Sequence, residues 1–226
     1  PKTETMVADG CQEALFLLSQ AILTQGDEVI ITDPAYIAYH SLVAFAGAKP
    51  IYVAGTLDNG FQLDEEMLKS RTSRRTKLVM YSTPDNPTGR IIKQDALKTV
   101  VDLANDHGFW ILSDEAYRHI TYGIPHTYTC AVSGGRDVTI STCSFSKEAS
   151  MPGIRVGMIL SPAPVIENAD KIKQVCTIAP GSLGQLAAKK FLEGDIKQRY
   201  LQEVVLPTYR KRRTAMEKAL KEYLPE

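Results

Sequence analysis

Strand-like and helix-like segments alternate along this chain from Thr5 to Leu160. Short runs rich in β-branched residues, such as Val29–Thr32 and Thr76–Tyr81, are separated by segments with apolar residues at helical spacing, such as Asp95–His107. This alternation implies crossover connections, which place strands in a mainly parallel sheet between layers of helices. We therefore expect an α/β three-layer sandwich with a mainly parallel seven-stranded sheet. The order of the strands stays open.

The last expected strand and the segments after it break the alternation. The segment Arg155–Leu160 follows the sixth strand, Val138–Thr142, so closely that it should return antiparallel to it. From Val165 onward the apolar spacing is helical, and the final helix is expected over Ile196–Leu224. Pro207 should kink or interrupt that helix, because proline lacks the backbone N–H and its ring clashes with the preceding turn.

Composition places the chain among ordinary globular proteins and excludes several function classes. It has 226 residues, of which 44% are hydrophobic and 23% charged. Lysine plus arginine (26) equals aspartate plus glutamate (26), so no excess charge favours nucleic acid or an anionic membrane as a partner. The four cysteines have no metal-ligand spacing, so we expect reduced thiols, no metal site and a cytoplasmic location.

Polar side chains that could bind a ligand or take part in catalysis follow the ends of several expected strands. Asn86 lies in the loop Asp85–Gly89, Asp114 and Tyr117 follow the fifth strand, and Lys147 and Arg155 follow the sixth. Taken singly, these are a turn asparagine, a capping aspartate and a surface lysine. Because the carboxyl ends of parallel strands form the ligand-binding edge of an open α/β sheet, we expect them to gather there.

Together these segments resemble the fold-type I pyridoxal-phosphate (PLP) enzymes, in particular the class I and II aminotransferase family. The resemblance runs from about Thr5 to Leu224. It implies that Lys147 holds the cofactor as a Schiff base and then moves a proton as general base and acid. It also implies that Asp114 faces the pyridine nitrogen and that Asn86 and Tyr117 donate hydrogen bonds to the 3′-oxygen. The catalytic candidates are thus Lys147, Asp114 and Tyr117, whereas Glu115 is not expected to be catalytic.

The same resemblance assigns residues to the cofactor's phosphate and to the face of its ring. Backbone N–H groups of Gly10, Cys11 and Gln12 would bind the phosphate at a helix start. The guanidinium of Arg155 and the hydroxyl of Ser144 would complete that site, with Ser146 as a weaker candidate. Tyr36 would stack on the ring, and its neighbour Tyr39 competes for that role. The predicted cofactor-binding set is Gly10, Cys11, Gln12, Tyr36, Asn86, Asp114, Tyr117, Ser144, Lys147 and Arg155.

The expected activity is transfer of an amino group between an L-amino acid and a 2-oxo acid. A PLP-dependent C–S β-lyase and a non-enzymatic cofactor-sensing domain remain open, because the cofactor residues do not separate them. A third alternative is that this chain looks truncated and is only a folded large domain, which binds PLP at best and is inactive alone. By resemblance, residues 1–195 form the PLP-binding large domain. Residues 196–226 form a long helix leading toward a small C-terminal domain outside this sequence, which would carry the arginine for the substrate carboxylate. The parent protein is expected to be a homodimer.

Overall fold

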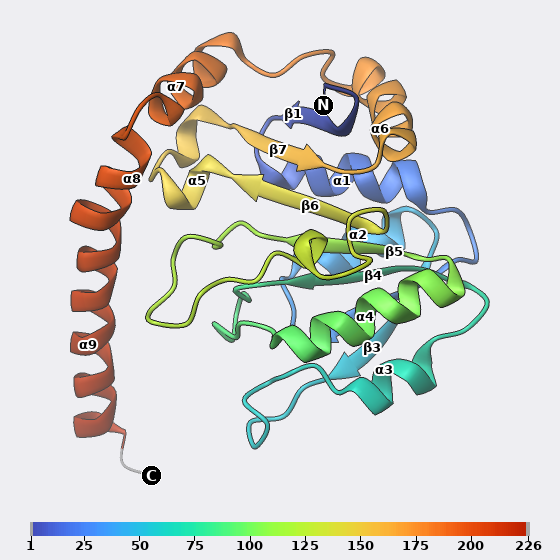
Figure 1. Cartoon of the computed structure of the whole chain (residues 1–226), viewed down its shortest axis with the longest axis horizontal. Coiled ribbons are helices and arrows are strands. Elements are labelled where there is room, and N and C mark those ends of the chain that lie inside the picture. Colours follow the sequence, from blue (N-terminus) through green and yellow to red (C-terminus); the bar gives the residue numbers. More distant parts are fainter. Residues whose placement is uncertain (1, 225–226) are drawn as a thin grey trace.

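The computed structural model describes residues 2–224 and contains one seven-stranded sheet (Figure 1). Its strands are β1 (Thr5–Ala8), β2 (Glu28–Asp33), β3 (Lys49–Ala54), β4 (Thr76–Ser82), β5 (Trp110–Asp114), β6 (Thr139–Ser144) and β7 (Gly157–Leu160). They lie in the order β1-β7-β6-β5-β4-β2-β3. Strand β7 runs antiparallel to both of its neighbours, and the other pairings are parallel. The expected α/β class and the antiparallel seventh strand are confirmed.

Helices cover both faces of the sheet. Their bounds are α1 (Cys11–Ile22), α2 (Ala38–Phe45), α3 (Glu65–Arg71), α4 (Gln94–His107), α5 (Phe145–Glu148), α6 (Ala163–Cys176), α7 (Ser182–Leu192), α8 (Ile196–Tyr200) and α9 (Leu206–Tyr223). Helices α1, α2 and α6 pack in one apolar core with side chains such as Met80 and Ile140. Helices α3 and α4 pack in a second core on the other face, with Val79 and Ile111. Neighbouring strand residues point to opposite faces, which is why Val79 and Met80 lie in different cores.

The C-terminal helices leave the sheet and run along one side of the molecule (Figure 1). Phe191 of α7 packs edge-on against Phe145 of α5, which joins this arm to the sheet. A π-helical segment, Leu201–Val205, links α8 to α9, and Pro207 lies in the first turn of α9. Pro207 has no backbone N–H to donate to the preceding turn, and the wider π turn before it accommodates this missing hydrogen bond. The regular α-helical pattern is thus interrupted next to Pro207, as expected, but the chain stays helical from α8 to α9.

Among the described residues, no helix combines the length and the apolar character needed to cross a membrane.

Candidate active site

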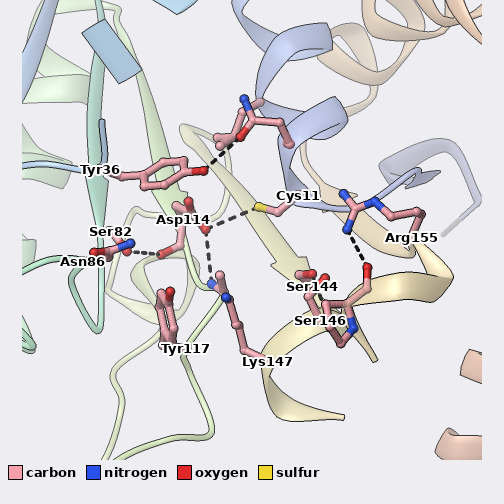
Figure 2. A pocket seen from close by; sticks show the side chains of 14 residues that line it. Cys11, Tyr36, Ser82, Asn86, Asp114, Tyr117, Ser144, Ser146, Lys147 and Arg155 are labelled. Atoms are coloured by element: carbon pink, nitrogen blue, oxygen red, sulfur yellow. Dashed lines mark hydrogen bonds between the residues drawn. The ribbon is translucent and has the colours of Figure 1, made fainter. Parts of the chain in front are cut away.

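A cavity of about 250 Å³ opens at the carboxyl ends of the central strands (Figure 2). It is enclosed by the start of α1, the loops after β4 and β5, and the segment that joins β6 to β7. The lining residues are Cys11, Gln12, Leu15, Tyr36, Ser82, Asn86, Asp114, Ala116, Tyr117, Ser144, Ser146, Lys147, Pro152 and Arg155. All predicted cofactor residues except Gly10 line this cavity.

Asp114 is the acidic group of the cavity, and it is nearly inaccessible to water (5% exposed). Its Oδ2 accepts a 2.9 Å hydrogen bond from the hydroxyl of Tyr39. Its Oδ1 accepts from the Cys11 thiol at 3.4 Å, the Ala116 N–H at 3.2 Å and the Thr142 hydroxyl at 3.4 Å. Burial raises the pKa of Asp114, while these donors act in the opposite direction. A cation placed against this carboxylate would favour its ionised form.

Tyr39 and Tyr36 divide the aromatic roles that the sequence left open. Tyr39 is fully buried, and its hydroxyl donates a hydrogen bond to Asp114. Tyr36 lines the cavity, and its hydroxyl donates to Gln12 Oε1 at 3.2 Å. The two rings meet edge to face, with centroids 5.6 Å apart. Tyr36 is therefore the tyrosine of this pair with a ring available to a flat ligand.

Lys147 and Tyr117 face each other at the mouth of the cavity (Figure 2). The Nζ atom of Lys147 lies 5.8 Å from the centroid of the Tyr117 ring. Lys147 sits on the short helix α5, whose first turn is capped by Ser144: its Oγ accepts from the N–H of Ser146 at 3.1 Å. Burial raises the pKa of Tyr117, and hydrogen bonding with Asn86 opposes that rise. Among the described residues that line the cavity, Lys147 carries the only primary amine.

The opposite end of the cavity is cationic. Arg155 donates from Nη2 to the carbonyl of Asp9 and from Nη1 to the carbonyl of Pro152, each at 3.0 Å. Gly10 is the N-cap of α1 with φ +83°, and a Cβ there would lie 2.2 Å from Arg155 Nη2. Gly10 therefore lies directly against the guanidinium, and its backbone conformation, φ +83° with ψ 171°, strains any residue that has a Cβ. Ala14 N makes the first intrahelical bond to Gly10 O, so the N–H groups before it remain directed toward the helix start.

The carboxylates of the neighbouring residues Asp114 and Glu115 lie in different surroundings. Glu115 follows Asp114 in sequence but lies outside the cavity. It is buried on the other side of the strand and accepts from the hydroxyls of Ser113 at 3.2 Å and Ser141 at 3.0 Å. This placement agrees with the expectation that Glu115 has no catalytic role.

The sequence did not indicate one residue that lines the cavity and one that supports Asp114 from behind. Ser82 lines it at the end of β4, and its hydroxyl donates to the carbonyl of Pro84 at 2.9 Å. Thr142 reaches Asp114 from the neighbouring strand. A signal was present for Thr142, because it lies two residues before Ser144 and side chains alternate along a strand. Ser82 had the weaker signal of directly following an expected strand.

These groups fit PLP. A dianionic phosphate needs a cation and free backbone donors, which the start of α1 and Arg155 provide together. A protonated pyridine nitrogen needs a buried carboxylate, which Asp114 provides. A phenolic 3′-oxygen needs donors, and Asn86 and Tyr117 line the same cavity as the primary amine of Lys147.

Comparison with known proteins gives matches along the whole chain. The sequence matches the family of class I and II aminotransferases over residues 1–225. The aspartate aminotransferase of Pyrococcus abyssi (strain GE5 / Orsay) is 32% identical over 98% of this chain and 57% of that protein. The aspartate/prephenate aminotransferase of Thermus thermophilus is 33% identical over 93% of this chain and 54% of that protein. The chain thus spans a little over half the length of these relatives.

A solved structure agrees with the sequence relatives. The aromatic aminotransferase from Pyrococcus horikoshii OT3 superposes with a TM-score of 0.93 at 31% sequence identity, covering 98% of this chain and 60% of that one. The match in fold, the match in sequence and the cavity at the strand ends lead to one assignment. The chain belongs to the class I and II aminotransferase family.

Proposed function

We propose that this chain is the cofactor-binding part of a PLP-dependent aminotransferase that exchanges an amino group between an L-amino acid and a 2-oxo acid. The observation that carries the proposal is the convergence of Asp114, Asn86, Tyr117, Lys147 and Arg155 on one cavity from separate loops. Family membership supports the same activity. The proposal includes both substrates and a homodimeric parent protein.

When bound, PLP supplies a pyridine ring that accepts the electrons released as a bond to the amino-acid α-carbon breaks. Asp114 holds the proton on the ring nitrogen, because its buried carboxylate pairs with the positive charge. Asn86 and Tyr117 donate hydrogen bonds to the 3′-oxygen and stabilise its negative charge. Tyr36, which lines the cavity, would cover one face of the ring and exclude water from it.

Lys147 has two tasks in this proposal. Its amine is the covalent attachment point of the cofactor in the resting protein. As a free amine it would act as general base and then general acid, holding and moving the proton of the substrate's α-carbon. The capped turn of α5 fixes the start of this flexible side chain, so the amine stays directed into the cavity.

The residues that would anchor the cofactor are different from those that would act on the substrate. Arg155, Ser144 and the N–H groups of Gly10, Cys11 and Gln12 bind the phosphate, far from the reacting carbon. Binding energy from such a remote group holds the reacting part in register. We further propose that residues 1–195 form the PLP-binding domain, because the residues lining the cavity fall within that range. Residues 196–226 would form the part that leads away from it, and of these the residues 225–226 lie outside the described structure.

Reductive labelling tests the proposal. The purified chain is mixed with PLP, reduced with borohydride and digested, and the modified peptide is identified by mass spectrometry. We expect the label on Lys147. Label spread over surface lysines, or found on another single lysine, would contradict the assignment.

A donor screen follows. The loaded protein is incubated with single amino acids, without a 2-oxo acid, and the products are measured. One equivalent of 2-oxo acid per site is expected for a transaminase half-reaction. Continuous release of ammonia and thiol from a sulfur amino acid would instead identify a β-lyase.

A further inference from the structure

A buried ion pair lies behind the anion-binding end of the cavity. Lys173 on α6 donates from Nζ to Glu13 Oε2 on α1 at 2.8 Å, and their side chains are 4% and 11% exposed. Thr177 completes the group: its hydroxyl accepts from Lys173 at 3.0 Å and donates to Glu13 Oε1. The two helices pack side by side on the same face of the sheet (Figure 1). None of these three residues lines the cavity.

Glu13 ties this pair to the turn that holds Arg155. Its Oε2 accepts from the N–H of Asp9 at 2.5 Å, so the third residue of α1 reaches back to the residue before its N-cap. The carbonyl of the same Asp9 accepts from Arg155. The Asp9 carboxylate is directed to the N–H of Gly181 at 3.3 Å. A continuous series of contacts therefore runs from Lys173 through Glu13 and Asp9 to Arg155.

The charge of Glu13 presents a conflict at this position. A carboxylate in the first turn favours the helix, because it faces the positive end of the helix dipole. The same carboxylate repels an anion that binds to that helix end. Burial alone would raise the pKa of Glu13, but hydrogen bonds from Lys173, Thr177 and Asp9 outweigh burial and hold that pKa below its usual value. Glu13 is thus ionised, and its charge needs a partner.

We propose that Lys173 is a charge-compensating positioning residue for the cofactor's phosphate. It neutralises Glu13, so that Glu13 can hold the β1–α1 turn without repelling the dianion at the start of α1. Lys173 acts through Glu13 and does not touch the ligand. This inference rests on the proposed function and adds residues that position the groups around the phosphate end of PLP.

The test compares PLP with pyridoxal, which has the same ring and aldehyde but no phosphate. Dissociation constants for both are measured by spectroscopic titration on the full chain and on Lys173→Met, Glu13→Gln and the double variant. For Lys173→Met we expect PLP binding to weaken about tenfold, because an unpaired carboxylate remains beside the phosphate, and pyridoxal binding to stay unchanged. Glu13→Gln should bind PLP within about twofold of the unmodified chain. The double variant should recover to within about threefold, since both charges are gone.

Two further variants make the comparison secure. Glu28→Gln removes another paired carboxylate with a largely buried side chain (6% exposed), which pairs with Arg75 at 2.6 Å at the amino end of β2, and should leave both dissociation constants unchanged. Lys173→Gln removes the same charge but keeps donors to Glu13, so it replaces the methionine variant if that one does not fold. Thermal unfolding monitored by circular dichroism shows which variants are folded.

The possible outcomes separate the two proposals. If the unmodified chain binds no PLP, the proposed function fails and the inference fails with it. If the chain binds PLP but Lys173→Met weakens PLP and pyridoxal equally, the pair has only a structural role and the inference is overturned. A double variant no better than Lys173→Met overturns it too, because charge compensation requires recovery.

Discussion

The sheet with its covering helices and the arm formed by α7, α8 and α9 are built in opposite ways. In the first region, side chains such as Leu17 and Val79 are completely buried, and polar groups such as Asp114 have fixed partners. In α9 no described residue is buried, and Leu220 is 46% exposed. The chemistry is placed in the first region because a reactive geometry needs neighbours that cannot move independently. The arm contributes no residue to the cavity.

The largest effect is expected where the first region carries its chemistry. Lys147→Ala should abolish borohydride-stable attachment of PLP, since no other described cavity residue has a primary amine. Mass spectrometry of the intact protein measures the attachment. The matched control is Lys171→Ala, an exposed lysine of α6 whose Nζ bonds to Asn168, which should keep full labelling. Undiminished labelling of Lys147→Ala would place the reactive amine elsewhere.

A core truncation should break the first region itself. Leu17→Ala removes buried methyl groups between α1 and the sheet, at a side chain with 0% exposure. Deleting such a side chain costs roughly 2–5 kcal/mol through lost burial and a residual cavity. Chemical denaturation gives the free energy of unfolding. A loss under about 1 kcal/mol would mean that the α1 core is loosely packed.

Tyr39→Phe tests whether the Tyr39 hydroxyl helps to keep Asp114 ionised. The Tyr39 hydroxyl lowers the pKa of Asp114 by donating to its ionised form, so removing that hydroxyl raises this pKa further. Asp114 then takes up its proton at higher pH, and PLP affinity should begin to fall at a higher pH as the solution is acidified. We expect about tenfold weaker PLP binding at the acidic end, measured by titration at a series of pH values.

The control for this variant is Tyr81→Phe. Tyr81 is equally buried, and its hydroxyl bonds to Thr129 at 2.9 Å on the other face of the sheet. The loss of a buried hydroxyl is therefore matched, but Asp114 is untouched. A shift of the pH profile in both variants would point to general loosening instead of a direct effect on Asp114.

The smallest effect is expected in the arm. Leu220→Ala should change the free energy of unfolding by less than about 0.5 kcal/mol, because its side chain is already half in water. Paired with Leu17→Ala under the same denaturant conditions, it measures how unequal the two regions are. A loss comparable with that of Leu17→Ala would show that α9 makes apolar contacts in solution that bury Leu220.

Local patterns predicted much of the molecule. Short apolar runs located the seven strands and helical spacing located the main helices, because the central strands are buried on both faces whereas a helix such as α4 buries one. The residues expected at the cavity lie there because they follow strand ends, and parallel strands end at one edge. The antiparallel return of β7 was predictable too, since its link to β6 is too short for a crossover.

Other features could not be predicted from local sequence patterns. The short helix α5 spans only Phe145–Glu148, too few residues for a helical repeat to appear. The side chain of Cys11 turns from the phosphate end toward Asp114 and Thr142, although its position predicted only a backbone role. Such an orientation depends on atoms from three separate strands and helices.

The sequence by itself determined the kinds of element, their succession and the residue types at the ends of the strands, all of which follow from short-range spacing. Only the tertiary structure decided the order β1-β7-β6-β5-β4-β2-β3 and the pairing of distant groups. Tyr39 meets Asp114 across 75 positions, and Glu13 meets Lys173 across 160. These contacts form because sheet order and helix packing bring the residues together, and no local period records a partner so far away.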